Sequence, residues 1–158
     1  EFGPLISAKQ RDRVAGFVEA GKREGGELVC GGTSPNRPGY FFEPTVLTHM
    51  SSEMTPVKNE IFGPVLCVQT FGDDDLDRIA REANSTIYGL SGSVWTRDLG
   101  IAMQMVRKID SGQVSVNMHA AIDPAMPFGG NKQSGWGREF GKEGLEPYLK
   151  TKGISMTW

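Results

Sequence analysis

Two side chains near the middle of the chain carry groups that can bind a ligand. In the run Glu60-Ile61-Phe62-Gly63-Pro64, an extended backbone would direct Glu60 and Phe62 to one face and Ile61 to the other. A carboxylate can accept two hydrogen bonds from a ribose diol, and an aromatic ring can pack beside a nicotinamide. The alternative is a surface glutamate beside a core phenylalanine, and the residues alone favour that alternative.

A glycine-rich loop over residues 128–137 is the second candidate for ligand binding. It does not match the dinucleotide-binding pattern Gly-x-Gly-x-x-Gly, because Gly135-x-Gly137 is followed by glycine only at position 141. The run over 137–143 is one residue short of a phosphate-binding P-loop and ends in glutamate where serine or threonine is needed. The spacing therefore favours a structural loop that needs positive φ angles over a phosphate cradle.

The cysteines and histidines do not form a recognisable metal or hydrolase site. Cys30 and Cys67 have no metal-ligand spacing, and each lies in an apolar stretch. This context predicts two small buried hydrophobes in a reducing compartment, so we expect a cytoplasmic protein. His49 and His119 have no second metal ligand at a suitable spacing, and no serine, histidine and aspartate set can be assembled. We expect no bound metal.

The pattern of apolar residues predicts helices that alternate with strands. Helices are expected over residues 7–22, 74–83, 98–109 and 141–148, and extended segments over 27–30, 40–47, 65–71, 90–96, 113–117 and 153–158. The run 65–71 is mostly apolar, which is typical of a strand buried on both faces. In the helix over 98–109, the expected inward residues are Leu99, Ala102, Met105, Val106 and Ile109. The alternation predicts an α/β fold with parallel packing, as one compact unit followed by a tail.

The composition excludes two classes of partner. The formal net charge of the 158 residues is −2, with 17 basic and 19 acidic side chains, so the clustered basic surface that nucleic acid requires is absent. No apolar run approaches the roughly 20 residues of a membrane-spanning helix. The chain opens without methionine, and its first residues are typical of the interior of a longer sequence.

Six short segments resemble the aldehyde dehydrogenase superfamily, and together they cover nearly the whole chain. Two of them are Asn59-Glu60-Ile61-Phe62-Gly63-Pro64-Val65 and Pro127-Phe128-Gly129-Gly130 with its continuation to Glu139; the others are residues 3–7, 39–47, 83–90 and 112–117. Each is weak alone, but six in the family's order and at its spacings are specific. The resemblance implies the C-terminal part of the family's catalytic domain over residues 1–148, a parallel-rich sheet with helices, and an oligomerisation tail over 149–158.

The family oxidises aldehydes to carboxylic acids with NAD or NADP as cofactor. A cysteine thiolate attacks the aldehyde, hydride passes to NAD(P)+, and a glutamate-activated water releases the acid. The resemblance implies that Glu60 holds the nicotinamide-side ribose and that Phe62 packs beside the nicotinamide ring. Asn59 departs from the second acidic residue of many relatives, and we expect little effect because its side chain should point away from the ribose.

The resemblance also implies a substrate tunnel. Ile122 and Phe128 would line it, Leu90 would lie near it, and Glu139 matches a glutamate proposed to relay protons to the water-activating base. The run over 117–127 is most similar to enzymes for arylacetaldehydes, with betaine-aldehyde-type enzymes as the close competitor. A single methylene or ring contact discriminates by only about 1–3 kcal/mol, so both substrate classes stay open.

The resemblance further implies that several parts of the machinery lie upstream of residue 3. These are the nucleophilic cysteine, the general-base glutamate, the oxyanion-hole asparagine and the phosphate-binding turn, and neither Cys30 nor Cys67 matches the nucleophile. We therefore expect a fragment that is inactive alone, joining a homodimer or homotetramer through a strand over 152–158. The alternatives are a free-standing binding or assembly module without the chemistry and a phosphate-binding module. The choice between NAD and NADP stays open, because it depends on residues of the missing half.

Overall fold

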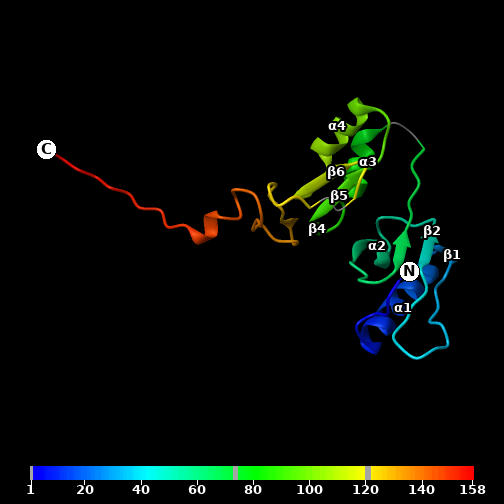
Figure 1. Cartoon of the computed structure of the whole chain (residues 1–158). Coiled ribbons are helices and arrows are strands. Elements are labelled where there is room, and N and C mark those ends of the chain that lie inside the picture. Colours follow the sequence, from blue (N-terminus) through cyan, green and yellow to red (C-terminus); the bar gives the residue numbers. More distant parts are fainter. Residues whose placement is uncertain (1, 73–74, 120–121) are drawn as a thin grey trace. The chain divides into compact units, whose positions relative to one another are not determined.

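The chain forms two compact units, residues 1–75 and 76–158 (Figure 1). The computed structural model describes residues 2–72, 75–119 and 122–158. The expectation of one compact unit followed by a tail is therefore wrong. The physical reason lies in the sheets, because every strand pairing among the described residues closes within its own unit.

The first unit packs one long helix against a three-stranded sheet. Helix α1 (Ala8–Arg23) begins at Ser7, whose hydroxyl accepts a hydrogen bond from the backbone N–H of Gln10 at 3.2 Å. The sheet order is β1 (Glu27–Cys30), β2 (Thr45–Thr48) and β3 (Val65–Cys67); β1 pairs antiparallel with β2, and β2 pairs parallel with β3. A short helix, α2 (Thr55–Lys58), lies against α1. The core cluster consists of Val14, Val18, Phe42 and Ile61.

Two strands of this unit are shorter than the sequence predicts. The extended run expected over 40–47 becomes a strand only at Thr45, and the run expected over 65–71 ends at Cys67. The prediction that this second run is buried on both faces is wrong, because Leu66 is 60% exposed. Strand β3 pairs on one side only and lies at the edge of its sheet. Cys30 is exposed and Cys67 is half-buried, so the expectation of two buried thiols fails for Cys30.

The second unit is built around a β-α-β segment. Helix α3 (Leu76–Ala83) and helix α4 (Leu99–Lys108) contact each other, and α4 packs on the parallel pair β5 (Ser91–Val94) and β6 (Gln113–Val116). Asp98 caps α4 by accepting a hydrogen bond from the N–H of Ile101 at 2.9 Å. Strands β4 (Tyr88–Gly89) and β7 (Asn131–Lys132) form an antiparallel pair. A 3-10 turn, η1 (Glu146–Tyr148), precedes the tail.

Several boundaries in this unit differ from the sequence-based expectation. Ala102 and Met105 are buried in α4, but Leu99 is 73% exposed because it lies in the first turn of the helix. The helix expected over 141–148 is reduced to η1, and residues 149–158 form no helix or strand. The helix expected from residue 74 begins at Leu76, and residue 74 lies outside the described part of the chain.

The fold class is α/β, as expected, but the sheets are mixed. Two strand pairings are parallel and two are antiparallel among the described residues. The prediction of a parallel-rich sheet is therefore wrong. The antiparallel pairs are β1–β2, which follows a glycine-rich turn after β1, and the short β4–β7 ladder. The alternation of apolar residues within a strand does not reveal the direction in which that strand pairs.

Glu24 joins α1 to α2 and generates a pH prediction. Its carboxylate accepts hydrogen bonds from the N–H and the hydroxyl of Thr55, both at 2.6 Å, and these bonds hold the pKa of Glu24 below its usual value. A lowered folded-state pKa stabilises the fold above the unfolded-state pKa, and this contribution is lost as the pH falls through the folded-state pKa. We expect Glu24→Gln to lower the melting temperature of unit 1 at pH 7, and we expect this difference from the parent to shrink as the pH falls below the usual glutamate pKa and to vanish below the folded-state pKa of Glu24, as measured by calorimetry.

Glu19→Gln is the matched control. Its carboxylate pairs with the exposed Lys22 at 2.8 Å, and an exposed ion pair of this kind contributes little. An equal loss of melting temperature in the two variants at pH 7 would contradict the assigned role of Glu24.

Candidate functional site

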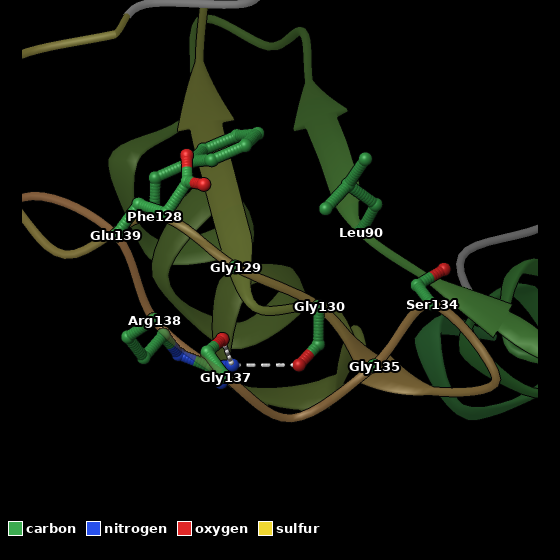
Figure 2. A pocket seen from close by; sticks show the side chains of 9 residues that line it. All are labelled: Leu90, Phe128, Gly129, Gly130, Ser134, Gly135, Gly137, Arg138 and Glu139. Atoms are coloured by element: carbon green, nitrogen blue, oxygen red, sulfur yellow. Dashed lines mark hydrogen bonds between the residues drawn. The ribbon is translucent and has the colours of Figure 1, made fainter. Parts of the chain in front are cut away.

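A pocket of about 360 Å³ in the second unit brings together three of the residues singled out from the sequence. Leu90, Phe128 and Glu139 line it, although 38 residues separate the first two in the chain. Figure 2 shows Phe128 beside Glu139 and Leu90 across from them, with the glycine-rich stretches 129–130 and 135–137, called the floor below, under these side chains. The complete lining is Leu90, Phe128, Gly129, Gly130, Ser134, Gly135, Gly137, Arg138 and Glu139.

Phe128 and Glu139 lie opposite each other in an isolated antiparallel bridge. The N–H of Phe128 donates to the carbonyl of Glu139 at 2.8 Å, and the N–H of Glu139 donates to the carbonyl of Phe128 at 2.7 Å. Directly opposed residues project their side chains to the same face, and Figure 2 shows the phenyl ring beside the carboxylate. The backbone thus places an apolar surface and an acid side by side at the pocket.

Close contact between backbone segments requires glycine at positions in and next to the pocket. A Cβ on Gly112 would overlap the carbonyl oxygen of Gly129, and a Cβ on Gly129 would overlap the carbonyl oxygen of Gly137. Within residues 127–137, Gly135 is the glycine with a positive φ, at 102°. The structural interpretation of this loop accounts for three of its four glycines: Gly129 and Gly130 allow close approach of the backbone, and Gly135 allows a left-handed backbone.

Arg138 holds the floor together, and the sequence analysis did not single it out. Its guanidinium donates to the carbonyl of Gly130 at 2.6 Å, to the carbonyl of Gly137 at 3.0 Å and to the side chain of Asn131 at 3.0 Å. Asn131 in turn donates to Asp110 at 2.9 Å. An arginine within a run of glycines is itself the missed signal, because such a loop has many carbonyls and few local donors for them.

Ser134 is a second residue that the sequence analysis missed. Its hydroxyl accepts a hydrogen bond from the N–H of Gly89 at 3.0 Å, which ties the loop to strand β4. Ile122, predicted to line the same tunnel, is 56% exposed and is not among the residues that line the pocket.

Glu60 and Phe62 belong to the first unit. Glu60 is exposed, Phe62 is 71% exposed, and Ile61 between them is buried at 8% exposure. The segment is not a strand, and Phe62 adopts a left-handed φ of 53°. As expected, Ile61 is buried while Glu60 and Phe62 are exposed. The backbone that produces this arrangement is, however, not an extended strand. The alternative of a core phenylalanine is excluded by the exposure of Phe62.

The two cysteines lack the surroundings of an activated thiol. Burial raises the pKa of the Cys67 thiol, which disfavours the thiolate that a nucleophile requires. The sulfur of Cys30 is exposed and lies 3.8 Å from the carbonyl oxygen of Pro44. In the described ranges, no three His, Cys, Asp or Glu side chains are grouped closely enough to hold a metal ion, and no helix there is long and apolar enough to span a membrane.

Comparison with known proteins identifies the family. The model of the aldehyde dehydrogenase family matches residues 1–154. The chain belongs to the aldehyde dehydrogenase family. All six segments that carry the resemblance in the sequence lie within this matched range.

Curated relatives are identical to the chain at about two fifths of the aligned positions. A betaine aldehyde dehydrogenase of Bacillus subtilis is 42% identical over 98% of the chain and 32% of its own length. A cytosolic 10-formyltetrahydrofolate dehydrogenase of Xenopus laevis is 40% identical over 100% of the chain and 18% of its own length. The chain thus spans between about a fifth and a third of these relatives.

Solved structures agree with this assignment. The betaine aldehyde dehydrogenase of Staphylococcus aureus, solved in complex with NAD+, is 41% identical and superposes with a TM-score of 0.91. The match covers 96% of the chain and 31% of that enzyme.

The backbone contact at Gly112 generates a stability prediction. We expect Gly112→Ala to lower the free energy of unfolding of the second unit by about 2 kcal/mol or more, because its methyl group meets a backbone oxygen that cannot move aside. Tryptophan fluorescence during urea unfolding reports on this unit, since all three tryptophans (Trp95, Trp136 and Trp158) lie in it. Gly137→Ala is the control, because nothing lies within 4 Å of its added Cβ. Equal destabilisation by the two substitutions would refute the packing argument.

Proposed function

We propose that this chain is the C-terminal part of an NAD(P)-dependent aldehyde dehydrogenase that oxidises an aldehyde to a carboxylic acid. The observation that carries the proposal is the convergence of Leu90, Phe128 and Glu139 on one pocket, in a chain that belongs to this family. The nucleophilic cysteine and the nucleotide-binding half would be supplied by the remaining two thirds or more of the protein, consistent with the share of the relatives that the chain covers. The chain alone is then inactive.

The exposed groups of the first unit fit the cofactor. Glu60 presents a solvent-accessible carboxylate, which suits the two hydroxyl groups of the nicotinamide-side ribose. Phe62 presents an uncovered ring, which suits the flat nicotinamide. NAD(P)+ supplies the hydride acceptor of the reaction, and NAD+ is the form bound in the Staphylococcus aureus enzyme. In this proposal the two residues orient the ribose and the ring, and they transfer no proton.

The pocket of the second unit fits the substrate side of the reaction. Leu90 and Phe128 supply apolar surface for the organic part of the aldehyde, and Ile122 would join them when the tunnel is complete. Glu139 is exposed at the edge of this surface, where its carboxylate can accept and return a proton during hydrolysis. Arylacetaldehydes and betaine aldehyde are both candidate substrates. Two of the similar enzymes are betaine aldehyde dehydrogenases, which favours betaine aldehyde.

The cysteines bear on the location of the protein in the cell. Both cysteines are free thiols, as expected for a reducing compartment such as the cytoplasm, while the named relatives include both cytosolic and mitochondrial proteins.

A free-standing, non-catalytic binding or assembly module is the second candidate. The uncovered apolar side chains of the tail favour an assembly role: Ile154 is 79% exposed, Met156 is 73% exposed and Trp158 is fully exposed. The coding sequence upstream of Glu1 distinguishes the two candidates, because the fragment proposal requires a cysteine motif and a nucleotide-binding half there.

Loss of the Glu60 carboxylate tests the cofactor role. In the longer enzyme that contains this chain, we expect Glu60→Gln to raise the dissociation constant for NAD+ by about tenfold, because hydrogen bonds to a charged acceptor are the stronger kind. Fluorescence titration measures this constant. Glu53→Gln, which alters an exposed carboxylate paired with Lys58, should leave the constant unchanged. If Glu60→Gln also leaves it unchanged, Glu60 does not hold the ribose.

The tail generates a prediction on assembly. Ile154, Met156 and Trp158 alternate with Ser155 and Thr157, so an added strand would place the three apolar side chains on one face. We expect the chain to self-associate at micromolar concentration in sedimentation experiments and Ile154→Lys to weaken that association. Ser155→Lys, on the other face, should weaken it less. A strictly monomeric parent chain would overturn the prediction.

A further inference from the structure

Two side chains of α1 hold the backbone that carries Glu60 and Phe62. Arg13 donates from Nη2 to the carbonyl of Glu60 at 2.9 Å and from Nη1 to the carbonyl of Ile61 at 2.7 Å. Gln10 donates from Nε2 to the carbonyl of Ile61 at 3.1 Å and to the carbonyl of Phe62 at 2.8 Å. Because Gln10 and Arg13 are three residues apart on one helix, they lie on the same face, and together they bind three consecutive carbonyls.

The local backbone cannot satisfy these carbonyls by itself. Residues 59–64 form neither helix nor strand, and the left-handed φ of 53° at Phe62 turns the chain away from a ladder. An unpaired carbonyl beside a buried side chain is costly, and Ile61 is part of the core. The four hydrogen bonds from α1 therefore replace secondary structure in this segment.

Further contacts support both the Arg13 donor and the backbone of residues 60–63. The guanidinium of Arg13 lies over the ring of Phe17 at 4.8 Å from the ring centre, so the donor has its own support. Gly63 packs directly on Val14, where an added Cβ would overlap the valine side chain. With Ile61 in the core and the carbonyls directed to α1, the side chains of Glu60 and Phe62 are left in solvent.

We propose that Gln10 and Arg13 are positioning residues, which set the directions of the Glu60 carboxylate and the Phe62 ring by holding the carbonyls of residues 60–62. The proposal rests on the cofactor role proposed above for Glu60 and Phe62. Gln10 and Arg13 act through the backbone of this segment, so their contribution to cofactor binding depends on Glu60 being intact. Such pre-organisation reduces the ordering that a ligand must otherwise impose on its site.

Hydrogen exchange in the 158-residue chain tests the grip itself. Arg13→Ala removes two hydrogen bonds, and we expect about tenfold faster exchange of the amides of Val65 and Thr45, which donate to the carbonyls of Gly63 and Pro64 at 2.8 Å, with little change in β1. Arg11→Ala is the matched control, because the Arg11 side chain is bonded to the neighbouring Asp12 on the exposed surface. Equal exchange in the Arg13 and Arg11 variants would overturn the proposal.

A second variant distinguishes the loss of these hydrogen bonds from a general loss of stability. Gln10→Glu keeps the size of the side chain but removes its N–H donors, so it should accelerate exchange over the same residues without a cavity or a lost aromatic contact. Arg13→Lys should restore part of the protection, because one ammonium group can reach a carbonyl but lacks the fork that spans two. Full protection in Gln10→Glu would overturn the proposal for that residue.

A double-mutant cycle in the longer enzyme separates positioning from general stability. We expect Arg13→Ala to raise the NAD+ dissociation constant about fivefold in the parent and to have little effect when Glu60 is already Gln. Equal effects in both backgrounds would show that Arg13 does not act through Glu60 and would overturn its positioning role. If Glu60→Gln by itself leaves the constant unchanged, the cofactor role fails, while hydrogen exchange still decides whether α1 holds the segment.

Discussion

Irregular backbone must find donors for its carbonyls, and this constraint shapes both units. Glu60 and Phe62 lie on residues 59–64, which form neither helix nor strand, and Phe128 and Glu139 lie outside the helices and strands of the second unit, joined by an isolated bridge. In each unit one arginine collects the unpaired oxygens: Arg13 binds the carbonyls of residues 60 and 61, and Arg138 binds those of residues 130 and 137. A guanidinium suits this task because its planar fork presents several donors at once. The arginines thus hold the backbone in place, while the side chains of Glu60, Phe62 and Glu139 stay exposed for contact with a ligand.

The two units contribute different surfaces to the proposed chemistry. The first presents a carboxylate and an aromatic ring, and the second presents an apolar pocket with Glu139 at its edge. In the first unit, burial raises the pKa of the Cys67 thiol and so disfavours the thiolate that a nucleophile requires. A chain that covers 31% of a solved family member fits a part of such an enzyme that holds cofactor and substrate while the reacting thiolate comes from elsewhere.

Particular residues show where reasoning from sequence succeeds and where it stops. Helix α4 (Leu99–Lys108) forms within the predicted range 98–109, because the apolar periodicity that predicts a helix acts over neighbouring turns and can be read locally. The burial of Leu66 was predicted incorrectly, because an apolar run does not reveal that its strand lies at a sheet edge. Phe62 was assigned to an extended run, whereas its left-handed φ depends on α1 and on the packing of Gly63 against Val14.

The sequence by itself determined the family, the α/β class, the positions of the main helices and the identities of Leu90, Phe128 and Glu139 as candidate residues. Those features are encoded in short motifs, in caps and in periodicity, all of which act over a few residues. The tertiary structure decided the mixed strand pairing, the exposure of Phe62 and the gathering of the pocket residues. It also revealed Arg13, whose partners lie 47 and 48 residues away in the chain. Such contacts form only when distant segments pack, because a donor side chain carries no local mark of which carbonyl it will meet.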